Sequence, residues 1–250
     1  MKAKVRFLLA VLVIGIIIEL IFHFTDLTLV HDEVMHNLLV VVITRLITGG
    51  SLLYIVRDLD YDIFRKIKIN DLIFIFPFVL IVINNLPIAS FILKEAYLVK
   101  PVSYTIIFAL SCFSVALSEE IAFRGIIFNY LKEIKREKSL FWVIIGQAVI
   151  FALVHFFNLF FGAGLIDVIL QVGYTFLIGV MLAVVLHKTK NIWLCVALHA
   201  IYNFGGLLLP TLGGGIWINT VTVIITVVLA VSGAIYVVFI FKKDKDFHKV

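Results

Sequence analysis

Long apolar runs, most of them about 20 residues and separated by short polar loops, repeat along this 250-residue chain. An α-helix rises ~1.5 Å per residue, so about 20 apolar residues are enough to cross the ~30 Å hydrocarbon core of a bilayer. The runs predict eight membrane-spanning helices, at residues 7–25, 37–56, 72–93, 103–130, 140–161, 168–187, 191–209 and 216–241. The pattern therefore predicts an all-α integral membrane protein, formed as a single membrane domain over residues 1–250.

The positive charges lie in alternate loops. If the N-terminus is cytoplasmic, the inner segments hold 17 Lys and Arg residues and the outer segments hold 2. An excess of Lys and Arg marks the cytoplasmic side of a membrane protein. The distribution predicts a multi-pass protein of the cell membrane with both termini in the cytoplasm. It also accounts for the net charge of +5 without a nucleic-acid partner.

Composition agrees with this assignment, because 63% of the residues are hydrophobic and only 15% are charged. A soluble domain has roughly 45–50% apolar and about 25% charged residues. Lipid is therefore the expected surroundings of the bundle. The oligomeric state is not predicted by any feature of the sequence.

Three polar clusters interrupt the apolar runs. They are Glu119-Glu120 with Arg124, Phe151 with His155, and His199 with Asn203. An ionisable side chain near the bilayer centre costs roughly 2.5–3.5 kcal/mol, so such residues usually line an internal cavity and carry function. Counted from the inner helix ends, Glu119, His155, His199 and Asn203 lie roughly 13–22 Å deep. Three helices could therefore bring these groups together in one layer.

Helical spacing divides the two carboxylates between different tasks. Residues four apart share a helix face, so Glu120 is expected to pair with Arg124. Glu119 is rotated by about 100° and faces elsewhere. A buried carboxylate with an imidazole suits the activation of water, and a second imidazole with an amide can stabilise an oxyanion. A zinc site held by Glu119, His155 and His199 is the alternative, although the sequence lacks an H-E-x-x-H motif.

At these residues the chain resembles the CPBP (also called Abi) intramembrane proteases, which include the type II CAAX prenyl endopeptidases. The family motifs E-E-x-x-x-R, F-x-x-x-H and H-x-x-x-N are intact and in order here, over approximately residues 105–210. The resemblance implies an endopeptidase that cleaves membrane-associated peptides or proteins and depends on a glutamate or on a metal such as zinc. It implies these roles: Glu119 activates water with His155, His199 and Asn203 form the oxyanion hole, and Glu120, Arg124 and Phe151 support the site or bind substrate.

Two other functions remain open. A protein of the same fold could act without catalysis, as a membrane scaffold or in bacteriocin immunity or signalling. A small transporter could use buried Glu and His to relay protons, but no inverted repeat is visible in the sequence.

Several further residues receive structural interpretations. Glu19 and Arg45 are expected to form a structural pair between the first two spans. Interhelical hydrogen bonds are expected from four amide side chains, Asn84, Asn85, Gln147 and Gln171. The glycine-containing segments 162–164 and 213–215 are expected to be turns on the outer side. Cys195, one turn before His199, is expected to pack in its helix rather than to form a dyad with that histidine.

Overall fold

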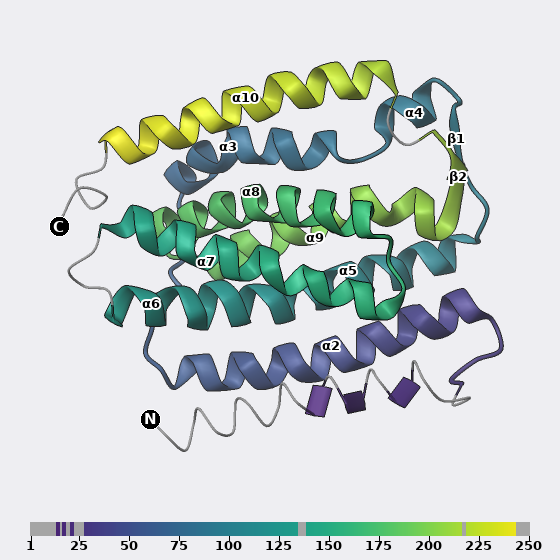
Figure 1. The fold of residues 1–250 in the computed structure, drawn as a ribbon, viewed down its shortest axis with the longest axis horizontal. Helices are drawn as coiled ribbons and strands as arrows, with labels where there is room; N and C mark the ends of the chain where they lie inside the picture. The colour runs from purple at the N-terminus through teal and green to yellow at the C-terminus, as the bar shows by residue number, and fades with distance from the viewer. Residues whose placement is uncertain are drawn as a thin grey trace.

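The computed structural model describes residues 28–134, 139–216 and 219–243, together with residues 14, 15, 17, 18, 21 and 22. Over these residues the fold is a helical bundle with one two-stranded sheet at one end (Figure 1). In chain order the elements are α2 (Glu33–Arg57), α3 (Ile69–Asn84), α4 (Ile88–Ile92), β1 (Ala96–Leu98), α5 (Val102–Glu120), the π-helix η1 (Ile121–Phe128), α6 (Asn129–Ile134), α7 (Leu140–Val154), the 3-10 helix η2 (His155–Phe161), α8 (Leu165–Thr189), α9 (Ile192–Leu212), β2 (Gly213–Gly215) and α10 (Thr220–Lys243).

Among the described residues, 6 helices are long and apolar enough to cross a membrane. The all-α class is thereby confirmed. The predicted span 72–93 is wrong as a single helix, because α3 ends at Asn84 and α4 starts after Pro87. Pro87 has no backbone N–H and restricts the residue before it, which favours a break. The span predicted at 7–25, which contains Glu19, lies largely outside the described residues, so the count of eight and the Glu19–Arg45 pair stay predictions.

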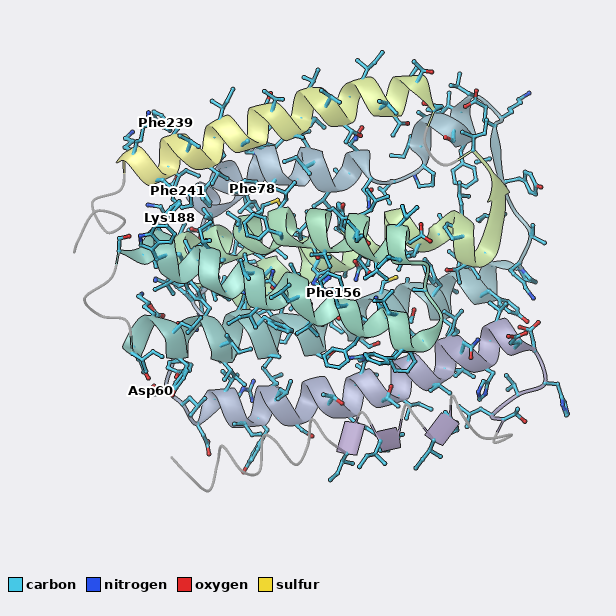
Figure 2. The ribbon with its side chains drawn as sticks, in the orientation of Figure 1. Asp60, Phe78, Phe156, Lys188, Phe239 and Phe241 are labelled. Carbon is cyan, nitrogen blue, oxygen red and sulfur yellow. The ribbon has the colours of Figure 1, made fainter. Side chains whose placement is uncertain are left out.

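The loops fall into two sets at opposite ends of the bundle. Asp60 and Lys188, from two loops predicted to face inward, lie at the same end (Figure 2). The strands β1 and β2 lie at the other end, where Ala96 pairs with Gly215 and Leu98 with Gly213 (Figure 1). Segment 213–215 was expected to be a turn and is instead a strand, whereas Gly162 has the left-handed conformation (φ 85°) of a turn glycine. This grouping agrees with the charge pattern, while the side of the membrane that each end faces stays a prediction.

The outer surface of the bundle is apolar. Phe239 on α10 is 56% exposed, whereas Phe78 on α3 is buried (Figure 2). An apolar exterior of this kind is what the hydrocarbon core of a bilayer would cover.

Helix α5 lies at the centre of the packing, with α2 and α9 against it. Small residues allow these close approaches, as is common between membrane helices. A Cβ atom on Gly49 of α2 would lie 3.2 Å from the backbone nitrogen of Ser118 on α5. A Cβ on Gly205 of α9 would lie 2.6 Å from the carbonyl oxygen of Asn85, after α3. These contacts fix the depth of α5 and α9 relative to their neighbours.

The start of α9 is anchored to the loop that follows α2. Asn191 caps the helix by accepting a hydrogen bond from the backbone N–H of Leu194 at 3.1 Å. Its Nδ2 donates to the carbonyl oxygen of Arg65 at 2.6 Å, and the N–H of Ile192 donates to the carbonyl of Ile63 at 2.8 Å. This anchor fixes the position of the helix that carries His199 and Asn203.

An ion pair joins the starts of α2 and α5. Lys100 Nζ donates to Asp32 Oδ2 at 2.8 Å, and Asp32 Oδ1 caps α2 through the N–H of Met35. The hydrogen bond from Lys100 and then that from Met35 lower the pKa of Asp32 below its usual range. A carboxyl with a lowered pKa in the folded state stabilises the fold above its unfolded pKa, and this contribution is lost as the pH falls through the folded pKa.

We therefore expect the melting temperature of the wild type to fall more steeply below about pH 4 than that of Asp32→Asn. Asparagine retains the helix cap and loses only the charge, so the comparison isolates the ion pair. Thermal unfolding in detergent from pH 3 to pH 7 measures the difference. Parallel curves for the two proteins over this range would contradict the assignment.

Candidate functional site

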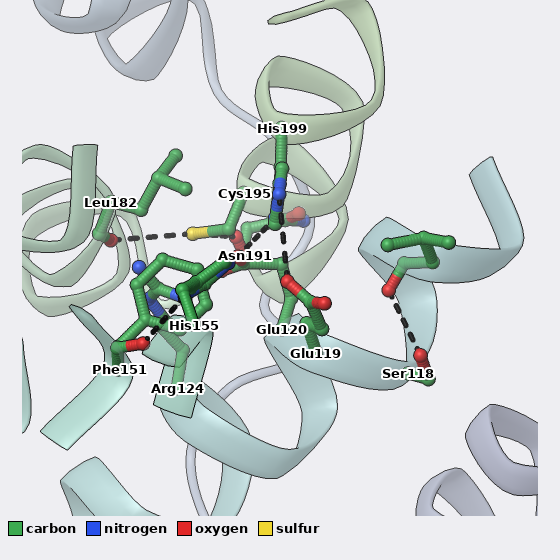
Figure 3. Close-up of polar contacts among 11 residues, drawn as sticks. Ser118, Glu119, Glu120, Arg124, Phe151, His155, Leu182, Asn191, Cys195 and His199 are labelled. Carbon is green, nitrogen blue, oxygen red and sulfur yellow. Dashed lines mark hydrogen bonds and ion pairs between the residues drawn. The ribbon is translucent and has the colours of Figure 1, made fainter. Parts of the chain in front are cut away.

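Residues from all three predicted polar clusters meet in the interior of the bundle, among them Glu119, His155 and His199 (Figure 3). Glu119 and Glu120 end α5, and Arg124 follows in η1. Phe151 lies near the end of α7, His155 begins η2, and His199 and Asn203 lie on α9. Glu119, His155, His199 and Asn203 all line one cavity of about 330 Å³. The geometry thus brings together the four residues for which the sequence predicts chemistry.

Glu120 is the centre of a buried ionic cluster. Its Oε1 accepts a hydrogen bond from Arg124 Nη1 at 2.8 Å and lies 2.7 Å from His199 Nδ1. The side chains of Glu120 and Arg124 are both 0% exposed. The predicted Glu120–Arg124 pair is therefore present. The contact of Glu120 with His199 was not predicted, because spacing within one helix does not show contacts between helices.

The contact with Glu120 determines how His199 presents its second nitrogen. An ionised carboxylate only accepts hydrogen bonds, so Nδ1 of His199 carries the proton that is donated to Glu120. Nε2 of the same ring faces Glu119, with 3.7 Å between Nε2 and Oε2. The side chain of Glu119 is 21% exposed, in contrast to the fully buried Glu120. Glu119 is therefore the carboxylate that the cavity can reach.

The helix that carries Arg124 changes type immediately after Glu120. Residues Ile121–Phe128 form a π-helix, in which backbone hydrogen bonds span five residues instead of four. Asn129 Nδ2 donates to the carbonyl oxygens of Arg124 and Gly125, both at 3.0 Å, which satisfies backbone acceptors at the end of this turn. Such π-helical turns occur frequently at functional sites. Arg124 is thus fixed at two points: its carbonyl oxygen accepts from Asn129, and its guanidinium donates to Glu120.

Phe151 joins the ionic cluster to the histidines. The guanidinium carbon of Arg124 lies 4.1 Å from the centroid of the Phe151 ring, which is a cation–π contact. The same ring meets His155 and His199 edge-on, with centroid distances of 5.1 and 6.0 Å. Phe151 was expected to support the site or to bind substrate, and its cation–π contact with Arg124 is a supporting contact of this kind.

His155 is oriented by the backbone of its own helix. Its Nδ1 lies 2.9 Å from the carbonyl oxygen of Phe151 (Figure 3). A carbonyl oxygen only accepts hydrogen bonds, so Nδ1 is the protonated nitrogen. In the neutral ring, Nε2 therefore keeps a lone pair, which is the state required of a base.

Additional polar side chains line the cavity, and the sequence did not assign them to the site. They are Asn85, Asn158, Gln171, Tyr174, Thr175 and Tyr202. The expected interhelical bonds are confirmed for three of the four amides: Asn84 donates to Thr226 Oγ1 at 2.8 Å, Asn85 to the carbonyl of Tyr202 at 2.6 Å, and Asn158 to Gln171 Oε1 at 2.7 Å. The expectation for Gln147 is wrong, because neither of its side-chain amide atoms has a hydrogen-bond partner in the described part of the chain.

One signal in the sequence could have identified part of this wall. Gln171, Tyr174, Thr175 and Ile178 of α8 follow the spacing of one helix face, and all four line the cavity. The polar members of this face distinguish it from the remainder of an otherwise apolar helix.

A second, apolar cavity of about 410 Å³ lies between α3, α8 and α10. It shares the lining residues Asn85, Tyr174, Ile178 and Tyr202 with the first cavity. These four residues therefore line both cavities, which lie next to each other.

The geometry bears on two alternative chemistries, a Cys/His dyad and a zinc site. Cys195 Sγ donates to the carbonyl oxygen of Leu182 at 3.4 Å, so its hydrogen bond goes to α8, and the expectation that this cysteine packs in its helix agrees with the structure. Over the residues that the structure describes, no group of three or more His, Cys, Asp or Glu side chains is arranged to hold a metal ion. Glu119, His155 and His199 as placed here therefore do not fit the zinc site considered above.

Comparison with known proteins gave one match. Residues 101–205 match the family model described as Type II CAAX prenyl endopeptidase Rce1-like. The resemblance predicted from the three motifs is thereby confirmed, and all the site residues lie within the matched segment. Neither the search of curated proteins nor the search of solved structures found a match. With the six apolar helices, this match supports a multi-pass membrane protein similar to CAAX proteases.

Proposed function

We propose that this chain, whose residues 101–205 match the Rce1-like family, is an intramembrane endopeptidase that cleaves membrane-associated peptides or proteins. One observation carries the proposal: a partly exposed carboxylate and two differently oriented imidazoles line a single cavity inside an apolar bundle. Amide hydrolysis needs a base for water and donors for the oxyanion, and the cavity contains both kinds of group.

Glu119 and His155 are the proposed pair that activates water. The Glu119 carboxylate and Nε2 of neutral His155 both accept hydrogen bonds, so each can hold one proton of the same water molecule. Glu119 takes a proton as the water oxygen attacks the carbonyl carbon of the scissile bond. The same proton then passes from Glu119 to the leaving amine as the C–N bond breaks.

His199 and Asn203 are the proposed oxyanion donors. Because Nδ1 of His199 already donates to Glu120, a donor at Nε2 requires the doubly protonated ring. The Glu120 oxygen, 2.7 Å from Nδ1, is the partner of the ring on its other side. Asn203 lies one turn further along α9 and lines the same cavity, where its amide nitrogen supplies a second donor.

Glu120, Arg124 and Phe151 are proposed to support the site and not to react. Glu120 accepts from Arg124 and contacts His199 through the same oxygen. Phe151 covers the Arg124 guanidinium and supplies the carbonyl that orients His155. These contacts orient both imidazoles at the cavity.

The test is the cleavage of a library of membrane peptides by the purified protein in detergent, with new peptide termini identified by mass spectrometry. We expect cleavage that survives a strong chelator. Loss of cleavage on chelation, restored by zinc, would contradict the glutamate mechanism and favour a metal site formed by rearrangement of the same residues. A folded protein that cleaves nothing would favour the binding role of a scaffold or immunity protein.

A further inference from the structure

The wall of the cavity beyond His155 is formed by two amide side chains. Asn158 of η2 and Gln171 of α8 both line the 330 Å³ cavity, and Asn158 Nδ2 donates to Gln171 Oε1 at 2.7 Å. Both residues are partly buried. The predicted catalytic motifs include neither of them, and the mechanism proposed above uses neither.

The change of helix type at His155 places Asn158 on the same face as this histidine. In a 3-10 helix, which has three residues per turn, the side chains at i and i+3 eclipse each other. His155 begins such a helix and Asn158 follows three residues later. With a rise of about 2.0 Å per residue, Asn158 stands about 6 Å further along the cavity wall than His155.

The bond between the two amides uses a proton of Asn158 Nδ2 and the oxygen of Gln171. Gln171 also hydrogen-bonds the hydroxyl of Tyr174. Because an amide nitrogen carries two protons, the Asn158 oxygen, an acceptor, and one N–H of Gln171, a donor, remain for a ligand. A peptide backbone offers the complementary pair, an N–H and a C=O, in each of its units. Because the two amides hold each other in place, little side-chain entropy is lost when a peptide binds to them.

We infer that Asn158 and Gln171 bind the backbone of the substrate peptide about two residues from the scissile bond. The distance follows from the geometry, since about 6 Å along the wall corresponds to two residues of an extended chain at about 3.3 Å each. This inference rests on the proposed function, and it makes the amide pair the element that positions the substrate across Glu119 and His155.

A purely structural role is the competing account, because the pair also joins η2 to α8. Gln171→Glu separates the two roles. The glutamate oxygen can still accept from Asn158, so the interhelical bond is kept, but the donor at Nε2 is lost. Gln171→Met removes both roles and serves as the reference for complete loss.

The experiment measures binding in a Glu119→Gln background, which prevents turnover. The probe is a pool of capped hexapeptides made of Ala, Leu, Val and Phe, compared with matched pools in which one backbone amide is replaced by an ester. Equilibrium dialysis in detergent, read by mass spectrometry, gives the retention of each peptide. We expect an ester at one position to weaken retention about tenfold, because the Asn158 oxygen loses its N–H partner. We expect retention of the all-amide pool to fall about tenfold in both Gln171→Glu and Gln171→Met, because the peptide carbonyl loses its donor.

Three outcomes would overturn the inference: no retention of the all-amide pool, equal retention of amide and ester at every position, or retention of the all-amide pool unchanged in Gln171→Glu. Cleavage by the protein with Glu119 intact is scored separately. If peptides are retained with the expected ester penalty but are not cleaved, the proposed hydrolysis is contradicted, while the proposed binding by Asn158 and Gln171 is supported. Cleavage without any ester penalty would contradict only the amide pair.

Discussion

Replacing Glu119 with glutamine is expected to lower kcat for peptide cleavage about a thousandfold, with KM changed little. Glutamine keeps the size and one acceptor of the glutamate but cannot take a proton, and general-base catalysis contributes roughly 10²–10⁴-fold. The side chain is partly exposed to the cavity, so its loss leaves no unpaired buried charge. Steady-state kinetics on the best peptide from the library measure the change.

The variant His155→Ala tests whether His155 and Glu119 act on the same water molecule. If the two residues activate the same water, the Glu119→Gln/His155→Ala protein should be no more than a fewfold slower than the worse single variant. Ser118→Ala is the matched control, because the Ser118 hydroxyl is one residue from Glu119 but donates to the carbonyl of Val115. Full activity in a folded Glu119→Gln protein would rule out the proposed base, and multiplicative losses would mean that the residues act separately.

Removing the charge of Arg124 is expected to lower the free energy of unfolding by about 3–5 kcal/mol. Arg124→Met leaves Glu120 buried without its guanidinium partner and with only the contact to His199. The double variant Glu120→Gln/Arg124→Met removes both charges and should recover most of this loss, since a buried ion pair replaced as a whole often costs little. Denaturation in mixed micelles, followed by circular dichroism, measures the three proteins side by side.

Arg65→Met provides the control for Arg124→Met. Arg65 pairs with Asp71 at 2.7 Å, but its side chain is 32% exposed, so its loss should cost less than about 1 kcal/mol. Equal destabilisation by Arg124→Met and Arg65→Met would mean that burial does not determine the strength of the Glu120–Arg124 pair. A double variant less stable than Arg124→Met alone would contradict the neutralisation argument.

The convergence of the three motifs could be predicted because it depends only on helix length, depth and the four-residue spacing of each pair. These quantities follow from an ideal α-helix. The contact between His199 and Glu120 could not be predicted from the sequence. It joins residues 79 positions apart and depends on how α9 is rotated against α5. The close approach of Gly205 on α9 to the backbone of Asn85 also helps to place α9, and patterns within a single segment do not reveal it.

The changes of helix type were also beyond the sequence. Residues 121–128 and 155–161 read as ordinary apolar helix, but the structure shows a π-helix in one and a 3-10 helix in the other. Each change rotates the side chains that follow it away from their α-helical positions. Asn158, which was not assigned to the site from the sequence, lies on the cavity wall with His155. Residues three apart share a face in an α-helix as well, so this spacing was a usable signal.

The ion pair between Glu120 and Arg124 has a consequence for how the chain is made. Both residues belong to the continuous helical segment Val102–Ile134, so their pairing requires no other helix. A segment entering the bilayer from the ribosome can therefore carry these two opposite charges as a neutral unit, which lowers the cost of insertion. His199 is synthesised 79 residues later and reaches Glu120 only after α9 has joined the bundle. The Glu120–Arg124 pair can therefore enter the bilayer before the site is complete, and the site is completed later, when His199 contacts Glu120.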